Sequence, residues 1–97
     1  MKTANEVRVI LHQNISDRYH AGQEKALRAL DLVNQNILNA VADCKTNTDM
    51  YILRITSFEN DTEKGAYITT LAEKIKEHGY TVAFHPSTGI MNIKWGF

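Results

Sequence analysis

The stretch EKGAYITTLAEKIKEHGYTVAFHPSTGIMNIKWGF, residues 63–97, decides the fold because it joins an amphipathic helix directly to two strands. Within it, apolar residues from Ile68 to Ile75 recur at spacings of three and four, which is typical of a buried helix face. Gly79 follows, and glycine readily adopts the left-handed conformation in which many helices end. We therefore expect a helix over residues 62–78.

A β-hairpin is expected directly after this helix. Apolar and polar residues alternate over residues 80–85 and again over residues 91–95, as they do in strands that are buried on one side. Between them, Pro86-Ser87-Thr88-Gly89 is a turn sequence. We expect the apolar alternates, including Trp95, to face the helices.

Two helices, a short one and then a long one, are expected at the start of the chain. Thr3 and Glu6 have the spacing of a capping box, which predicts a short helix over residues 4–13. Asn, Ser and Asp within residues 14–17 predict a break, because the apolar residues on its two sides are out of phase. A long helix over residues 17–43 follows. Its expected apolar stripe is Leu27, Leu30, Val33, Ile37, Leu38, Val41 and Cys44.

A strand over residues 50–58 is expected to complete the sheet. The segment is rich in β-forming residues, and Tyr51, Leu53 and Ile55 share one face, which we expect to be buried. Strand, helix and strand in this order predict a right-handed βαβ crossover. The predicted fold is a single α+β domain over residues 1–97, with a helical part (1–44) and a β-α-β-β part (50–97). The latter forms a three-stranded mixed sheet with helices on one face.

Composition excludes several classes of function. Eleven Lys and Arg residues balance eleven Asp and Glu residues, so no strong field steers the chain to nucleic acid or to an anionic membrane. No apolar run approaches the roughly 18 residues of a membrane span, and residues 1–6 are too polar for a signal peptide. We expect a cytoplasmic protein with no nucleic-acid or membrane partner.

No pattern of catalytic or metal-binding residues stands out. The four histidines His12, His20, His78 and His85 lack the spacings of zinc sites. Cys44, the only cysteine, has no pattern of basic residues around it that would activate it as a nucleophile. We expect no catalytic residue, no metal and no cofactor, and therefore a protein that is not an enzyme.

Two surfaces are candidate binding sites. The polar face of the predicted sheet could bind an anion or a peptide, although a solvated outer face has the same composition. Its residues are Arg54, Thr56, His85, Asn92 and Lys94. The second surface is apolar, because the long helix has more apolar length than a three-stranded sheet covers. The residues expected to remain exposed there, and to form a homodimer interface, are Leu32, Met50, Ile52 and Ile90.

The chain has a short polar N-terminus, a Lys/Glu-rich helix that ends in His78-Gly79-Tyr80, and the terminal Ile93-Lys94-Trp95. With these features, the segment from Glu63 to Phe97 resembles small accessory proteins encoded by tailed bacteriophages. The resemblance implies a protein that binds a host or viral component in the cytoplasm of a bacterium or of a phage-infected host. The sequence thus predicts a non-enzymatic interaction protein that self-associates through its long helix and binds a protein partner. The alternative is a small-ligand binding or sequestering protein with a pocket between subunits.

Overall fold

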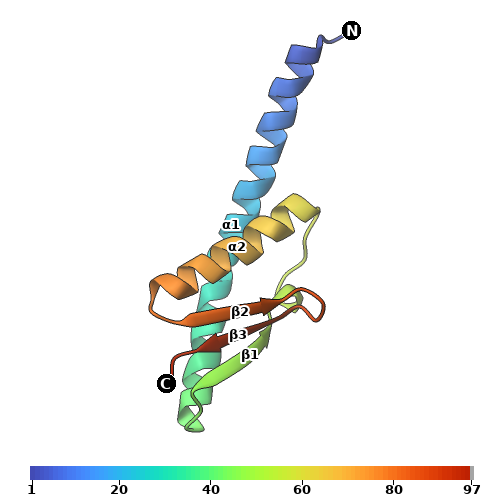
Figure 1. Ribbon diagram of the computed structural model, residues 1–97. Coiled ribbons are helices and arrows are strands. Elements are labelled where there is room, and N and C mark those ends of the chain that lie inside the picture. Colours follow the sequence, from blue (N-terminus) through green and yellow to red (C-terminus); the bar gives the residue numbers. More distant parts are fainter. Residues whose placement is uncertain (97) are drawn as a thin grey trace.

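The computed structural model describes residues 1–96 and has a long helix that extends beyond a small body (Figure 1). In chain order its elements are α1 (Ala4–Ala42), β1 (Asn47–Tyr51), the 3-10 helix η1 (Ile52–Arg54), α2 (Asp61–Glu77), β2 (Thr81–His85) and β3 (Ile90–Lys94). The molecule measures 63 × 23 × 20 Å along its principal axes. The helix α2 and the β2–β3 hairpin lie where the sequence predicted them, and Phe97 lies outside the described residues.

The predicted break at residues 14–17 is wrong, because α1 is one continuous helix. Its start is capped as expected, with the Glu6 backbone N–H donating to Thr3 Oγ1 at 3.2 Å. Asn, Ser and Asp disrupt a helix when their side chains compete for its backbone groups. Those at residues 14–17 are exposed, and the helix continues through them.

The face of α1 that packs overlaps the predicted stripe only in part, because Val33 and Ile37 are buried as expected and Leu30 packs partly buried against the core. The buried residues are Gly22, Ala26, Ala29, Val33, Ile37 and Ala40. Leu27, Leu38 and Val41 of the predicted stripe are 50%, 58% and 47% exposed. The small residues form the buried face because they allow α2 to approach α1 closely. The predicted break rested on a phase difference between the apolar residues of the first turns and this predicted stripe. That difference was misleading, because the residues buried in the second half of α1 are a partly different set.

The two α-helices cross at a glycine. A Cβ atom added to Gly22 would overlap the backbone oxygen of Glu63 and would lie 2.8 Å from Ala66 Cβ. Gly22 is therefore a point of close contact between α1 and α2. Asn60 caps the start of α2, because its Oδ1 accepts from the Glu63 backbone N–H at 2.8 Å.

The sheet is antiparallel throughout, with strand order β1-β3-β2. The predicted mixed sheet is wrong because β3 inserts between the two strands that α2 connects. The strands β1 and β2 therefore point the same way without pairing with each other. The inner face of this sheet and the two helices enclose one core.

The first strand is shorter than predicted and its faces are inverted. It ends at Tyr51, which is 47% exposed, whereas Met50 and Ile52 are buried. Met50 pairs with the buried Met91 of β3. Alternation could not assign the faces here, because both sets of alternating residues begin apolar. Trp95 packs partly buried against the core, edge-on to Tyr80 with ring centres 6.4 Å apart, as its alternation predicted.

Candidate functional site

The predicted polar sheet face is a flat surface on which the candidate residues do not converge. Asn92 lies on the central strand, and its Nδ2 donates to Asp49 Oδ1 at 2.7 Å. Lys94 and His85 are exposed and belong to opposite ends of the hairpin, because His85 pairs with Ile90. Four residues along a strand separate these ends by about 13 Å. One small anion could not contact both side chains.

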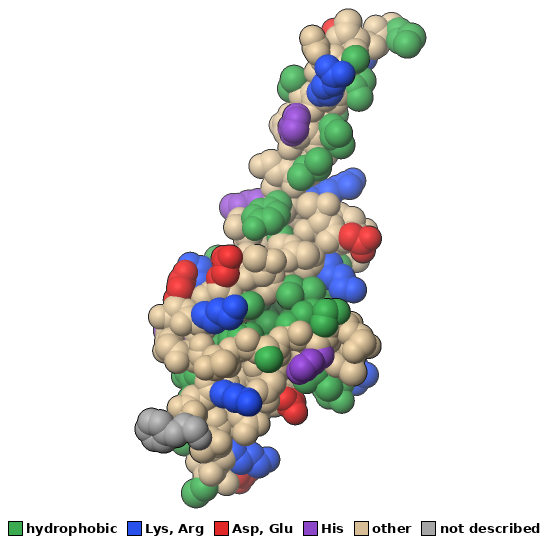
Figure 2. Space-filling model, viewed as in Figure 1, with side chains coloured by type: hydrophobic (Ala, Val, Ile, Leu, Met, Phe, Trp, Pro, Cys, Tyr) green, Lys and Arg blue, Asp and Glu red, His purple; other side chains and the backbone are tan. Residues whose placement is uncertain are grey.

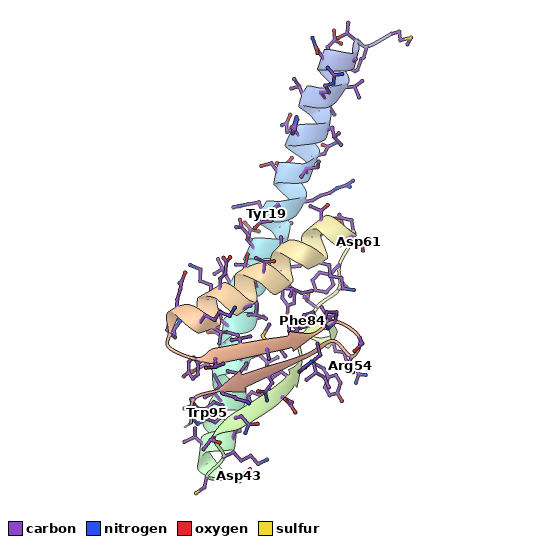
Figure 3. All side chains as sticks on the ribbon, viewed as in Figure 1. Tyr19, Asp43, Arg54, Asp61, Phe84 and Trp95 are labelled. Atoms are coloured by element: carbon purple, nitrogen blue, oxygen red, sulfur yellow. The ribbon has the colours of Figure 1, made fainter. Side chains whose placement is uncertain are left out.

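The other two residues predicted for this site lie elsewhere. The guanidinium of Arg54 stacks on the ring of Tyr51 at 4.3 Å. Figure 3 shows Arg54 beside the turn end of the hairpin, with Trp95 at the other end. Thr56 lies with Lys25, Arg28 and Leu32 around a shallow hollow of about 210 Å³ between α1 and the segment after η1. The five predicted residues thus do not converge on one point: His85, Asn92 and Lys94 are spread over the outer face of the sheet, and Arg54 and Thr56 lie beyond the end of β1.

The predicted oligomer patch is also divided. Leu32 is 41% exposed and Ile90 is half-buried, but Met50 and Ile52 belong to the core of the monomer. The sequence analysis placed Met50 and Ile52 on the surface because it assigned the buried and exposed faces of this strand the wrong way round. No continuous patch joins these four residues.

The polar groups inside the body are paired with one another and with the backbone. The Lys25 ammonium forms an ion pair with the buried Glu63 carboxylate and donates to the backbone oxygen of Ser57 at 2.8 Å. The Tyr67 hydroxyl donates to the backbone oxygen of Ile52 at 2.7 Å, and burial raises the pKa of Tyr67 to about 12. Every buried side-chain nitrogen and oxygen within residues 1–96 has a hydrogen-bond partner.

The residues that could bind a metal remain apart. Within the described chain, no three His, Cys, Asp or Glu side chains come together as a metal site would require. His78 Nδ1 lies 2.7 Å from the backbone oxygen of Lys74, and His20 Nε2 lies 3.4 Å from Glu24 on the next turn of α1. Cys44 is exposed, although the sequence placed it on the buried stripe.

The largest unpartnered feature is the first half of α1, residues 4–20, which we call the arm. All of these residues are exposed, and Figure 2 shows hydrophobic side chains along this projecting part of the helix. Four of them follow one another at intervals of one turn and form the arm ridge, Val7, Leu11, Ile15 and Tyr19. They are 52%, 53%, 43% and 42% exposed.

The arm ridge continues the stripe that is buried in the body. Leu11 precedes Ala29, and Ile15 precedes Val33, by about five full turns, so each pair lies on the same side of the helix. Ala29 and Val33 are covered by the body, whereas Leu11 and Ile15 extend past it. Figure 3 shows Tyr19 just beyond the point where α2 crosses α1. Sequence analysis missed this surface because the expected break at residues 14–17 separated the two halves of the stripe.

A groove of about 250 Å³ lies in the body along the second half of α1, and we call it the α1–α2 groove. It is lined by Leu30, Asp31, Val33, Asn34, Ile37, Ile75, His78 and Tyr80. Val33, Ile37 and Ile75 form a buried apolar floor. The Asp31 carboxylate and the Asn34 amide lie on its rim, and both residues are exposed.

The surface of the molecule is large for its mass. It exposes 6798 Å², whereas a globular monomer of 11.0 kDa exposes about 5,600 Å². Its radius of gyration is 16.6 Å, compared with about 12.5 Å for a compact chain of this length. The excess of about 1,200 Å² exceeds the roughly 800 Å² that each partner buries in a standard interface.

Comparison of the chain with protein families, with curated proteins and with solved structures finds no match. In the part of the chain that the structure describes, no helix combines the length and the apolar character needed to cross a membrane.

Proposed function

We propose that this chain is a non-enzymatic interaction protein that self-associates through α1 and, as a dimer, binds a protein partner. The observation that carries the proposal is the arm, whose four ridge residues are exposed on the part of α1 that projects beyond the body. We further propose that it acts in the cytoplasm of a bacterium or of a phage-infected host. The flat polar sheet face with His85, Asn92 and Lys94 is then available to the partner.

A second copy of the chain is the occupant that fits the arm best. The excess surface is enough for a standard interface, and a two-fold dimer buries the same apolar patch on both chains at once. Fully burying an exposed Leu or Ile side chain stabilises the buried state by about 1.5–3 kcal/mol. The arm presents Leu11 and Ile15 as a central pair, so a symmetric dimer buries two such pairs.

The proposal is tested by changing the arm ridge and measuring mass. We expect the unchanged protein to sediment as a dimer at micromolar concentration, at twice the monomer mass of 11.0 kDa. The double substitution Leu11→Lys and Ile15→Lys should weaken dimerisation at least about a hundredfold, because it places four charges in an apolar contact.

Leu32→Lys is the matched control, since Leu32 has a similar exposure of 41% but lies beside the Thr56 hollow. It should leave the dimer intact. A monomer mass for the unchanged protein throughout the micromolar range would rule out self-association as the function of the arm.

Binding of a small ligand is the second candidate function, and the α1–α2 groove is the observation in its favour. Its apolar floor and polar rim are typical of ligand sites, although its volume of about 250 Å³ is below the usual range of about 300–1,000 Å³. Native mass spectrometry of protein purified from its own host tests this candidate. A retained mass that disappears on Asn34→Trp would support it, and its absence from the unchanged protein would contradict it.

A further inference from the structure

We propose that the arm of one chain binds the arm of a second copy in antiparallel orientation, so that the dimer is a rod with one body at each end. The inference rests on the proposed function, because it names the part of the second copy that covers the arm ridge. That part is the same ridge, as in any two-fold contact. The excess surface of about 1,200 Å² is enough for it, since each partner buries roughly 800 Å² in a standard interface.

The helix α2 lies on the same side of α1 as the arm ridge. At 3.6 residues per turn, the ridge and the buried face of α1 have mean directions within about 20° of each other around the helix. On this side α2 crosses α1 at Gly22, below the arm (Figure 1). A partner helix that lies along the ridge therefore meets α2 shortly after Tyr19, and the arm is the part of α1 that this side leaves open to it.

The position of α2 selects the antiparallel orientation. If two ridges faced each other in a parallel pair, the two α2 helices would lie at the same level between the two α1 helices and would collide. When the arms run antiparallel, the two α2 helices lie at opposite ends of the contact. With the two-fold axis near His12, the partner's Ala4 lies at the level of His20. Because α1 begins at Ala4, the overlap of the two helices ends about where α2 begins to cross.

The apolar side chains of the two arms interleave in this arrangement. Along the helix axis, Leu11 and Ile15 lie on either side of the level of His12, at distances of about 1.5 Å and 4.5 Å. The antiparallel copy reverses these positions, so the four side chains alternate between the two chains along the contact. Leu11 and Ile15, which are 53% and 43% exposed in the single chain, are thereby covered together.

The centre of the contact contains no charged residue, as two-fold pairing requires. Close to a two-fold axis each residue lies beside its own copy, so a Lys, Arg, Asp or Glu there would meet a like charge. Residues 9–15, which lie within one turn of the axis, contain none of these four residue types. The nearest on either side are Arg8 and Asp17, and both lie more than one turn away.

The arrangement makes the dimer a spacer with two equivalent ends. From the axis near His12 to the level of Val33, at the centre of each body, is about 30 Å along the helix, so the two bodies lie about 60 Å apart. Each end has its own polar sheet face and its own α1–α2 groove, and the arms leave both uncovered. Such a dimer binds two partner molecules at once, or two sites on one large partner, and gains affinity from that bivalence.

Cross-linking of variants with one cysteine tests the arrangement. In a Cys44→Ser background, His12→Cys places a thiol beside the two-fold axis, so its two copies in a dimer lie about 8–10 Å apart, the usual distance between packed helices. A short bis-maleimide should link most chains of this variant into covalent dimers. Asn14→Cys, on the other flank of the ridge, should give the same result. Gln13→Cys is the matched control, because it lies at the same level but faces away from the partner, and it should link at least tenfold more slowly.

A position far from the axis distinguishes the two orientations. In the antiparallel pair, the two copies of Asn5→Cys are separated by about 20 Å along the helix axis and should not link. A parallel pair brings every residue to the level of its own copy. Linking of Asn5→Cys as rapid as that of His12→Cys would therefore refute the antiparallel arrangement.

Sedimentation equilibrium of the same samples separates this inference from the proposed function. If the variants sediment as dimers and neither His12→Cys nor Asn14→Cys links, the arms do not pair with each other, although self-association stands. If the unchanged protein sediments as a monomer throughout the micromolar range, both proposals are overturned.

Discussion

At the scale of single residues, Gly22 determines how the two α-helices cross. Glycine costs about 1 kcal/mol relative to alanine inside a helix, so its place in the middle of α1 needs a compensating gain. That gain is the close approach of α2, whose Glu63 and Ala66 backbone and side-chain atoms occupy the space of a Cβ. The same contact places Glu63 beside Lys25, which forms its ion pair.

We predict that Gly22→Ala destabilises the fold by about 1–3 kcal/mol, because the added methyl group forces α1 and α2 apart. Gly65→Ala is the matched control on α2, where an added Cβ has no neighbour within 4 Å. It should stabilise the protein by about 0.5–1 kcal/mol through helix propensity alone. Urea denaturation of both variants measures the difference, and equal effects would show that the crossing tolerates a side chain.

The end of α1 provides a second prediction at this scale. Cys44 has a φ of 59° in a helix-ending motif in which its N–H donates to the Val41 oxygen at 2.9 Å and the Lys45 N–H donates to the Ala40 oxygen at 2.9 Å. Glycine adopts this left-handed conformation without strain, as Gly79 does at the end of α2 with a φ of 93°. Cys44→Gly should therefore stabilise the fold by about 1 kcal/mol in chemical denaturation. A loss of stability would mean that the thiol makes a contact of greater value than the strain.

At the scale of elements, the sequence correctly predicted the helices and strands whose two faces differ clearly in polarity. The helix α2 and the β2–β3 hairpin have one apolar face each, and both were located from the sequence. The strand β1 begins at Asn47, before the predicted start at residue 50, and its buried and exposed faces were assigned the wrong way round. The faces were ambiguous because Met50 and Ile52 on one side and Tyr51 on the other are all apolar. The α1 stripe was predicted only in part. Val33 and Ile37 are buried, but the other buried positions are small residues that let α2 approach, and only the tertiary contact reveals them.

The candidate site was likewise predicted only in part. Surplus apolar surface on the long helix was predicted, but its location was not, since the arm ridge becomes visible only when α1 is known to be continuous. The groove could not be predicted at all, because it requires the position of Tyr80 and of the end of α2 relative to α1.

The arm provides the prediction for single elements. A helix without tertiary contacts is marginal in water at lengths near 12–15 residues, and Val7, Val9, Ile10 and Ile15 are β-branched residues that lower its propensity further. We expect residues 4–20 to be helical mainly in the dimer. Ellipticity at 222 nm should rise as the protein is concentrated through its dimerisation range. The Leu11→Lys, Ile15→Lys variant should show no such rise, and a constant signal in the unchanged protein would mean that the arm is helical by itself.

At the scale of the whole molecule, the chain combines a small core with a projecting helix. The body consists of two packed helices and a three-stranded sheet, with the core residues of α1 confined to the segment from Ala26 to Ile37. About half of α1 contributes nothing to this core. A domain of this size buries only a modest fraction of its surface. Burial of the apolar surface of the arm against a second chain would therefore stabilise the folded state further.

The shape of the dimer gives the last prediction, because the two modes of pairing place the bodies at different separations. If the two α1 helices pair antiparallel along their whole length, the two-fold axis lies near Gln23, the middle of α1, and about 15 Å along the helix from the level of Val33, at the centre of each body. Combined with the single-chain value of 16.6 Å, this gives a dimer radius of gyration of about 22 Å. If arm pairs with arm near His12, the axis lies about 30 Å from each body centre, and the radius exceeds about 30 Å. Small-angle X-ray scattering separates these values easily. A dimer mass with a radius near about 22 Å supports pairing along the whole of α1, and a radius above about 30 Å contradicts it, because only bodies held far apart by paired arms give so large a value.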